Sequence, residues 1–330
     1  MQLPNLDSLP SMFERSVQGR TLILDSDFPA YQAAATVKRL TTALTRFQTL
    51  VETERFLTGA EFVEVHLTPR GCTKCRRFDY PTVKPYQGQR TGPKPALLQP
   101  LRDAVETYSW PENWSVYSWR DREADDGMIM SGLRHGSNGI ISSGDKDLCL
   151  TSGPYWINDE GRLDIIPNRF GWISTKQMTS SVKVVGHGTK FFWAQMLMGD
   201  SADNVKGIIR YNAALCGPVA AYNILKDIQD ESEAANLVLR AYSKIPQDPL
   251  AEAQCLWLRR SDEDCAYKYL CELDLDSDLR AWLDALHQYH QQVLEIKQNA
   301  RNEERGQDST EASSPIEAGR ESDDPSLPWN

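Results

Sequence analysis

Short apolar runs that end in acidic residues recur along the first two thirds of this chain. The run Leu22–Leu24 precedes Asp25 and Asp27, and the run Gly139–Ser142 precedes Asp145 and Asp147. Such runs predict buried strands, and their alternation with helical segments predicts an α/β fold. In a fold of this kind, functional residues gather at the carboxyl ends of the strands. We therefore expect a site along one edge of the sheet.

Three acidic clusters hold seven carboxylates: Glu123-Ala-Asp-Asp126, Asp145-Lys-Asp147 and Gly199-Asp-Ser-Ala-Asp-Asn204. Carboxylates this dense repel one another unless cations or protons are bound. Hard oxygen ligands favour Mg²⁺, with Mn²⁺ as a substitute, and two such ions are a common device for cleaving phosphodiesters. We expect two groups of metal ligands, which are Asp25, Glu123, Asp125 and Asp126 in the first and Asp145, Asp147, Asp200 and Asp203 in the second.

The charge of the chain is unevenly distributed. The net charge is −10, which on its own disfavours a nucleic-acid partner. Residues 66–94, however, contain seven basic side chains and one acidic side chain, a net of +6. A basic stretch beside an acidic metal site suits a phosphate-backbone substrate. A solvated basic loop explains the stretch equally well when it is taken alone.

The pattern divides the chain into three parts. Residues 1–180 predict an α/β catalytic domain with a mixed central sheet flanked by helices, a long helix over 30–57 and a loop or arch at about 70–95. Residues 181–297 read as mostly helical. Residues 298–330 are polar and acidic, which predicts a disordered tail. No apolar run is as long as a membrane span, and the start of the chain lacks the features of a signal peptide, so we expect a cytoplasmic protein.

The order of the motifs resembles the 5′-nuclease family, which includes flap endonucleases and phage 5′→3′ exonucleases. The resemblance covers residues 20–230 and rests on Asp25, Tyr86-Gln-Gly-Gln-Arg90, Glu123-Ala-Asp-Asp126, Asp145-Lys-Asp147 and Gly199–Gly207. It implies a PIN-like catalytic domain, a helix–three-turn–helix that grips duplex DNA, two divalent ions, and K⁺ at the helix–three-turn–helix. The size of the chain is most similar to the phage proteins.

The resemblance also implies roles for the arch. Tyr86 would stack on the substrate, and Arg90 would contact the scissile phosphate through its paired donors. The family usually has Lys at the position of Gln87, and Lys84 or Lys94 would take its place. We expect the DNA backbone to contact the basic residues Arg76, Arg77, Lys94 and Lys206.

Two further positions depart from the family pattern. Thr68 stands where an acidic metal ligand is usual, which predicts weaker binding of the first ion. The loop from Gly207 to Gly217 is longer than usual and has glycine only at its ends.

The implied activity is metal-dependent 5′→3′ exonuclease or 5′-flap endonuclease cleavage of duplex DNA, extending to RNA primers in RNA–DNA hybrids during phage-type replication or recombination. We expect a monomer whose acidic tail docks on a replication protein. Two alternatives stay open. Asp25 and Asp27 also resemble the nucleophile and acid/base of haloacid-dehalogenase-type phosphatases. A weakly active DNA-end-binding protein would explain Thr68 and Gln87.

Overall fold

The computed structural model describes residues 16–89, 92–158 and 160–311. Its centre is a six-stranded sheet in the order β3-β2-β1-β4-β5-β6. Neighbouring strands run parallel, except that β6 is antiparallel to β5. The predicted mixed sheet is therefore confirmed. The strands are β1 (Val17–Asp25), β2 (Ala60–Leu67), β3 (Trp114–Ser118), β4 (Gly139–Ser142), β5 (Gly153–Ile157) and β6 (Arg162–Ile166).

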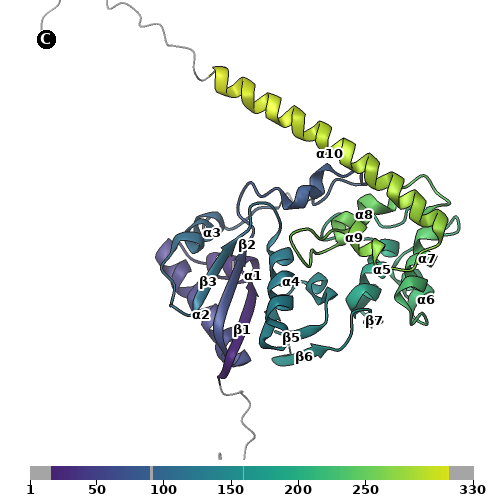
Figure 1. Cartoon of the computed structure of the whole chain (residues 1–330). Helices are drawn as coiled ribbons and strands as arrows, with labels where there is room; N and C mark the ends of the chain where they lie inside the picture. The colour runs from purple at the N-terminus through teal and green to yellow at the C-terminus, as the bar shows by residue number, and fades with distance from the viewer. Residues whose placement is uncertain (1–15, 90–91, 159, 312–330) are drawn as a thin grey trace, which may run out of the picture.

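Helices cover both faces of this sheet (Figure 1). Successive side chains of a strand point to opposite faces of the sheet, so the side chains of β1 pack alternately into two different cores. Leu22 and Leu24 pack in a core with residues of the first three helices, whereas Ile23 packs in the core that contains Met128 of α4. These helices are α1 (Asp27–Ala34), α2 (Leu40–Thr58), α3 (Leu98–Thr107) and α4 (Ala124–His135).

A two-stranded hairpin and a helical region follow the sheet. The hairpin pairs β7 (Trp172–Gln177) with β8 (Val182–His187). The helices are α5 (Gly188–Met198), α6 (Pro218–Leu225), α7 (Glu231–Tyr242), α8 (Pro249–Leu256), α9 (Ala266–Cys271) and α10 (Ser277–Glu311), and short 3₁₀ turns cover η2 (Lys74–Asp79), η3 (Gly136–Asn138) and η4 (Lys146–Leu150). One core joins Ile141 of the sheet to Trp193 and Leu283, so packing is continuous across the boundary expected at residue 180.

Two predicted elements differ from the structure. The single helix expected over 30–57 is broken between α1 and α2. The break contains the β-branched pair Thr36 and Val37, which have low helix propensity. Helix α2 then ends at Gly59, whose left-handed φ of 65° is favourable only for glycine.

The second difference lies at the C-terminal end. Helix α10 continues to Glu311, past the tail boundary expected at residue 298, and residues 312–330 lie outside the described residues. Tertiary contacts hold the helix at this point, because Lys297 donates to the carbonyl of Asp79 at 2.5 Å and Arg301 pairs with the Asp79 carboxylate. In Figure 1, α10 accordingly passes beside the segment that contains η2. Within the described residues, no helix is both long and apolar enough to cross a membrane.

Candidate active site

A cavity of about 640 Å³ opens at the carboxyl edge of the parallel strands. The parallel register places the ends of β1, β2 and β3 together, and α4 begins soon after β3. Five of the predicted metal ligands line the cavity, which are Asp25, Glu123, Asp125, Asp145 and Asp203. The sequence predicts two groups of acids, but the structure places Asp145 and Asp203 of the second group in the same cavity as Asp25, Glu123 and Asp125 of the first.

Three of these carboxylates, here called the open acids, form no ion pair with a described residue: Asp25, Asp125 and Asp145. Burial and the nearby charge of Asp27 raise the pKa of Asp25 to about 7. Burial and the charges of Asp25 and Asp145 also raise the pKa of Asp125 well above its ordinary value. The open acids therefore repel one another in the absence of a cation.

Arg77 forms ion pairs with Glu123 and Asp126, the two other acids of the cluster that contains Asp125. This guanidinium donates to Glu123 at 2.9 Å and to both oxygens of Asp126 at 2.8 and 2.7 Å. Asp126 also caps the start of α4 through the backbone N–H of Glu123 and accepts from the N–H of Arg259. Asp126 is fully buried and both its oxygens accept hydrogen bonds, so its role as a metal ligand stays a prediction. In this arrangement Asp126 holds the start of α4 in place.

The placement of Arg77 corrects a prediction. Arg77 was expected to contact DNA, but it is 2% exposed and donates as well to the carbonyl of Trp257 at 2.7 Å. It joins the arch segment, α4 and the helical region. Burial acts to raise the pKa of Glu123, but the charges of Arg77 and Lys74 outweigh burial and lower it to about 2.

Lys146 neutralises a second pair of acids. Its ammonium lies 3.0 Å from Asp147 and 2.6 Å from Asp200, and Gln195 of α5 donates to both carboxylates at 2.7 and 2.9 Å. Burial and the charge of Asp145 raise the pKa of Asp147 to about 7, against the opposing charge of Lys146. Glu123, Asp126, Asp147 and Asp200 are called the paired acids below.

The arch segment folds its polar side chains onto these acids. Tyr86 is 5% exposed and its hydroxyl donates to Glu123 at 2.7 Å. The ring of Tyr86 is packed inside the protein, so it is not exposed for stacking in this structure, and its stacking on the substrate stays a prediction. Gln87 donates to Glu123 at 3.1 Å and to Asp203 at 2.9 Å.

The cation beside Gln87 is Lys74, not Lys84 or Lys94. Its ammonium donates to Gln87 at 2.5 Å and to Glu123 at 2.8 Å. Thirteen residues separate Lys74 from Gln87, and the only sequence signal for Lys74 was its place in the basic stretch. Lys84 is exposed and does not line the cavity within the described residues. Arg90 lies outside the described residues.

Of the other predicted basic residues, Lys94 lines the cavity, whereas Arg76 and Lys206 are half-buried outside it. Lys94 is exposed and lines the cavity with Arg70, which the sequence did not single out. Neither forms an ion pair with a described residue. Arg76 instead binds Asp79 at 3.1 Å and the carbonyl of Leu294, and Lys206 lies outside the lining of the cavity.

Thr68, the position where an acid is missing, also lines the cavity. Its hydroxyl accepts from the backbone N–H of Ala124 at 2.8 Å. A free N–H at the first turn of a helix needs such a partner. Thr68 therefore helps to orient the first turn of α4, which carries Asp125.

The donor chemistry of the open acids fits a divalent ion. Carboxylates are hard oxygen ligands, and burial together with neighbouring carboxylates raises the pKa of both Asp25 and Asp125. Among the residues that the structure describes, however, no three His, Cys, Asp or Glu side chains converge closely enough to hold an ion.

A loop of the expected helix–three-turn–helix follows the paired acids. It connects α5 to α6 and contains bridges between Asp200 and Val205 and between Tyr211 and Ala214. Gly199 and Gly207 both have left-handed φ values, and a Cβ atom on either would meet the backbone of the other segment within 3 Å. Glycine at these two positions therefore allows the loop to close tightly.

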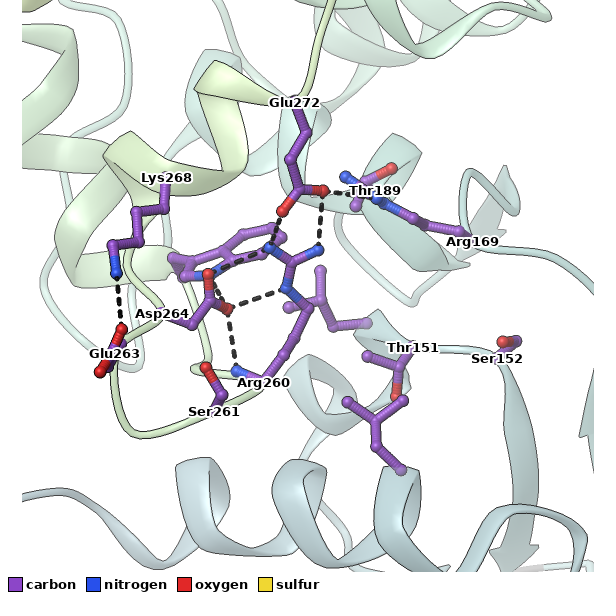
Figure 2. Close-up of a pocket in the computed structure, with 13 residues that line it drawn as sticks. Thr151, Ser152, Arg169, Thr189, Arg260, Ser261, Glu263, Asp264, Lys268 and Glu272 are labelled. Carbon is purple, nitrogen blue, oxygen red and sulfur yellow. Dashed lines mark hydrogen bonds and ion pairs between the residues drawn. The ribbon is translucent and has the colours of Figure 1, made fainter.

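A second cavity of about 480 Å³ lies between α4 and the helical region. Its charged side chains pair with one another, as Figure 2 shows. Arg260 binds Asp264 at 2.8 Å and also binds Glu272, which in turn binds Arg169 at 2.7 Å. Each charged side chain that lines this second cavity forms an ion pair with another lining residue, whereas the open acids form none with a described residue.

No protein-family model matches the sequence. No curated protein matches it either. The fold is similar to solved structures from bacteriophage T5. A T5 protein crystallised with metal ions is 17% identical with a TM-score of 0.41, covering 84% of this chain and 98% of that chain. A mutant T5 5′-exonuclease is 17% identical with a TM-score of 0.38, covering 84% and 99%.

A third structure is a bacteriophage T5 flap endonuclease in a pseudo-enzyme–product complex with DNA and metal ions. It is 17% identical with a TM-score of 0.46, and the match covers 84% of this chain and 99% of that chain. At this level of identity the similarity is one of fold, and it assigns no role to any residue of this chain.

Proposed function

We propose that this chain is a metal-dependent 5′-nuclease that hydrolyses phosphodiesters in duplex DNA. The observation that carries the proposal is the cavity that Asp25, Asp125 and Asp145 line without forming an ion pair with a described residue, and that Arg70 and Lys94 line as well. Acidic side chains that can bind cations and basic side chains that can bind anions therefore line the same cavity. A phosphate backbone with divalent ions satisfies both requirements.

The open acids would hold the ions, and Glu123 and Asp203 complete the acidic lining. Bound divalent ions supply positive charge against the phosphate and favour ionisation of an attacking water. Arg70 and Lys94 would bind the phosphates on either side of the scissile bond. Lys74 is held beside Glu123 and Gln87, where its ammonium is placed to stabilise charge that develops on the phosphate.

Finer features of the activity belong to the same proposal. We take Mg²⁺ as the ion, with Mn²⁺ as a substitute, and K⁺ at the loop from Gly199 to Gly217. The substrates would be duplex DNA with a 5′ end or flap and RNA–DNA hybrids at primers. The protein would act as a monomer in the cytoplasm of a host cell during replication, with a replication protein as its partner.

The phosphatase alternative is less well supported. Asp27, its acid/base, is held in an ion pair with Arg102 at 2.8 Å. That alternative also leaves Asp125, Asp145 and Asp203 in the cavity without a role.

The test compares a 5′-labelled flap duplex, a blunt duplex and a phosphomonoester, each with Mg²⁺ and with a chelator. We expect Mg²⁺-dependent cleavage of the two DNA substrates and no release of phosphate from the monoester. Binding of the flap duplex without cleavage would favour the DNA-end-binding alternative. Release from the monoester alone would replace the proposal with the phosphatase.

A further inference from the structure

A groove of about 610 Å³ lies next to the paired acids, on the side of Lys146. One wall is the turn of the β7–β8 hairpin, residues 178–181, together with the first residues of β8. The other wall includes Gly199, Asp200 and Ser201 at the start of the loop between α5 and α6. The hairpin thus approaches the same acids and the same loop that the proposed nuclease would use.

The hairpin differs in charge from the rest of the chain. The whole protein has 46 acidic and 36 basic residues, whereas the segment 172–187 contains two lysines and no acidic residue. Its turn is rich in hydroxyls, with Thr179, Ser180 and Ser181 all exposed. The turn is well defined, because the N–H of Met178 donates to the carbonyl of Ser181 at 2.8 Å. An acid-free, hydroxyl-rich tip is compatible with an anionic partner.

The two lysines are in register. Lys176 of β7 is paired directly with Lys183 of β8, so their side chains leave the same face of the hairpin. Both are exposed, and neither forms an ion pair with a described residue. Like charges directly opposite on antiparallel strands are destabilising. A bound phosphate between them would remove this repulsion.

We propose that the tip of the β7–β8 hairpin is a second DNA-backbone contact, in which Lys176 and Lys183 bind phosphates of the duplex held by the loop between α5 and α6. The inference rests on the proposed nuclease function. The lysines act on binding and not on the chemical step, because they are placed on the hairpin and not in the cavity of the open acids. Sugar-phosphate contacts of this kind position a duplex without reading its sequence.

The experiment measures equilibrium binding of a 5′-flap duplex by fluorescence anisotropy, with Ca²⁺ in place of Mg²⁺, at several salt concentrations. The variant is Lys176→Ala with Lys183→Ala. Each phosphate contact contributes about 0.9 to the slope of log K against log salt, so we expect the slope to fall by about two and the affinity at low salt to fall about 10-fold. Lys176→Arg with Lys183→Arg should retain both values.

A matched control removes two positive charges elsewhere. Lys38 and Arg39 are exposed in the connection between α1 and α2, and Lys38→Ala with Arg39→Ala changes the net charge by the same amount. We expect the slope for this control to equal that of the parent protein. An equal loss of slope in both double variants would show that only net charge matters, and would overturn the hairpin contact.

The outcomes separate the two proposals. A parent protein that cleaves and binds the flap duplex, with an unchanged slope in the lysine variant, would overturn the hairpin contact alone. A parent protein that neither binds nor cleaves DNA would overturn both. Should the alanine pair fail to fold, the single variant Lys183→Gln carries the same test, with an expected loss of slope of about one.

Discussion

Two sets of carboxylates lie at the same edge of the sheet and differ in what neutralises them. The paired acids receive Arg77 or Lys146 from the protein itself. No described residue forms an ion pair with the open acids. The difference is sharpest between neighbours, because Asp125 lines the cavity while Asp126 is fully buried against Arg77. Successive residues on a helix point about 100° apart, so adjacent acids can have opposite roles.

The largest expected effect is on cleavage, from a change to an open acid. Asp125→Asn keeps the shape of the side chain but removes a charge that the ions require. We expect the single-turnover cleavage rate to fall at least about 1000-fold, equivalent to about 4 kcal/mol. The melting temperature should stay the same or rise, because repulsion with Asp25 and Asp145 is relieved. Cleavage at the parental rate would remove Asp125 from the site.

The next effect is on stability, from a change to the cation of the paired acids. Arg77→Met leaves Glu123 and Asp126 without their buried partner, and breaking such a pair costs about 3 kcal/mol or more. Urea unfolding should show this loss. The control Arg70→Met removes an exposed cation from the cavity and should change the free energy of unfolding by at most about 0.5 kcal/mol. Similar stabilities for the two variants would contradict the distinction drawn here.

The third expected effect is on the pH dependence of stability in the metal-free protein. The folded-state pKa of Asp25 is raised from 3.8 to about 7, chiefly by burial and then by Asp27. A raised pKa means that the folded state binds the proton more tightly, so this contribution is complete below pH 3.8 and is lost as the pH rises through 7. We expect a loss of about 4 kcal/mol over this window, measured by urea unfolding in chelator.

The matched variant for the pH experiment is Asp25→Asn. It should flatten the stability profile of the metal-free protein between pH 4 and pH 7, as should saturating Mg²⁺ in the parent. A parental profile that is already flat over this window would contradict the raised pKa of Asp25.

The sequence predicted the strands and the acids that follow them, because both features are local. The runs at Leu22–Leu24 and Gly139–Ser142 became β1 and β4, and the cavity lies where the ends of parallel strands meet. The sequence did not predict which charges would meet. Lys74 reaches Gln87 and Glu123, and Tyr86 turns inward, because the segment folds back over α4. The positions of charged residues along the sequence do not indicate which of them form hydrogen bonds or ion pairs with residues distant in the chain.

The same limit explains the errors at the ends of elements. Local composition marked residues from 298 onward as disordered, but Lys297 and Arg301 are held by Asp79, more than 200 residues earlier in the chain. Arg77 was read as a surface cation for the same reason, since its burial depends on α4 and on Trp257. In each case a tertiary contact outweighs the local signal.

The bond from Arg77 to the carbonyl of Trp257 spans 180 positions of the chain, and this separation has a consequence for the order of folding. Contacts between residues so distant in sequence form late, because the intervening chain must first be brought together. We therefore expect Arg77 to obtain its full set of acceptors only when the residues around Trp257 have folded. Formation of the hydrogen bonds at the start of α4, and therefore of the site, is expected to depend on folding of the helical region.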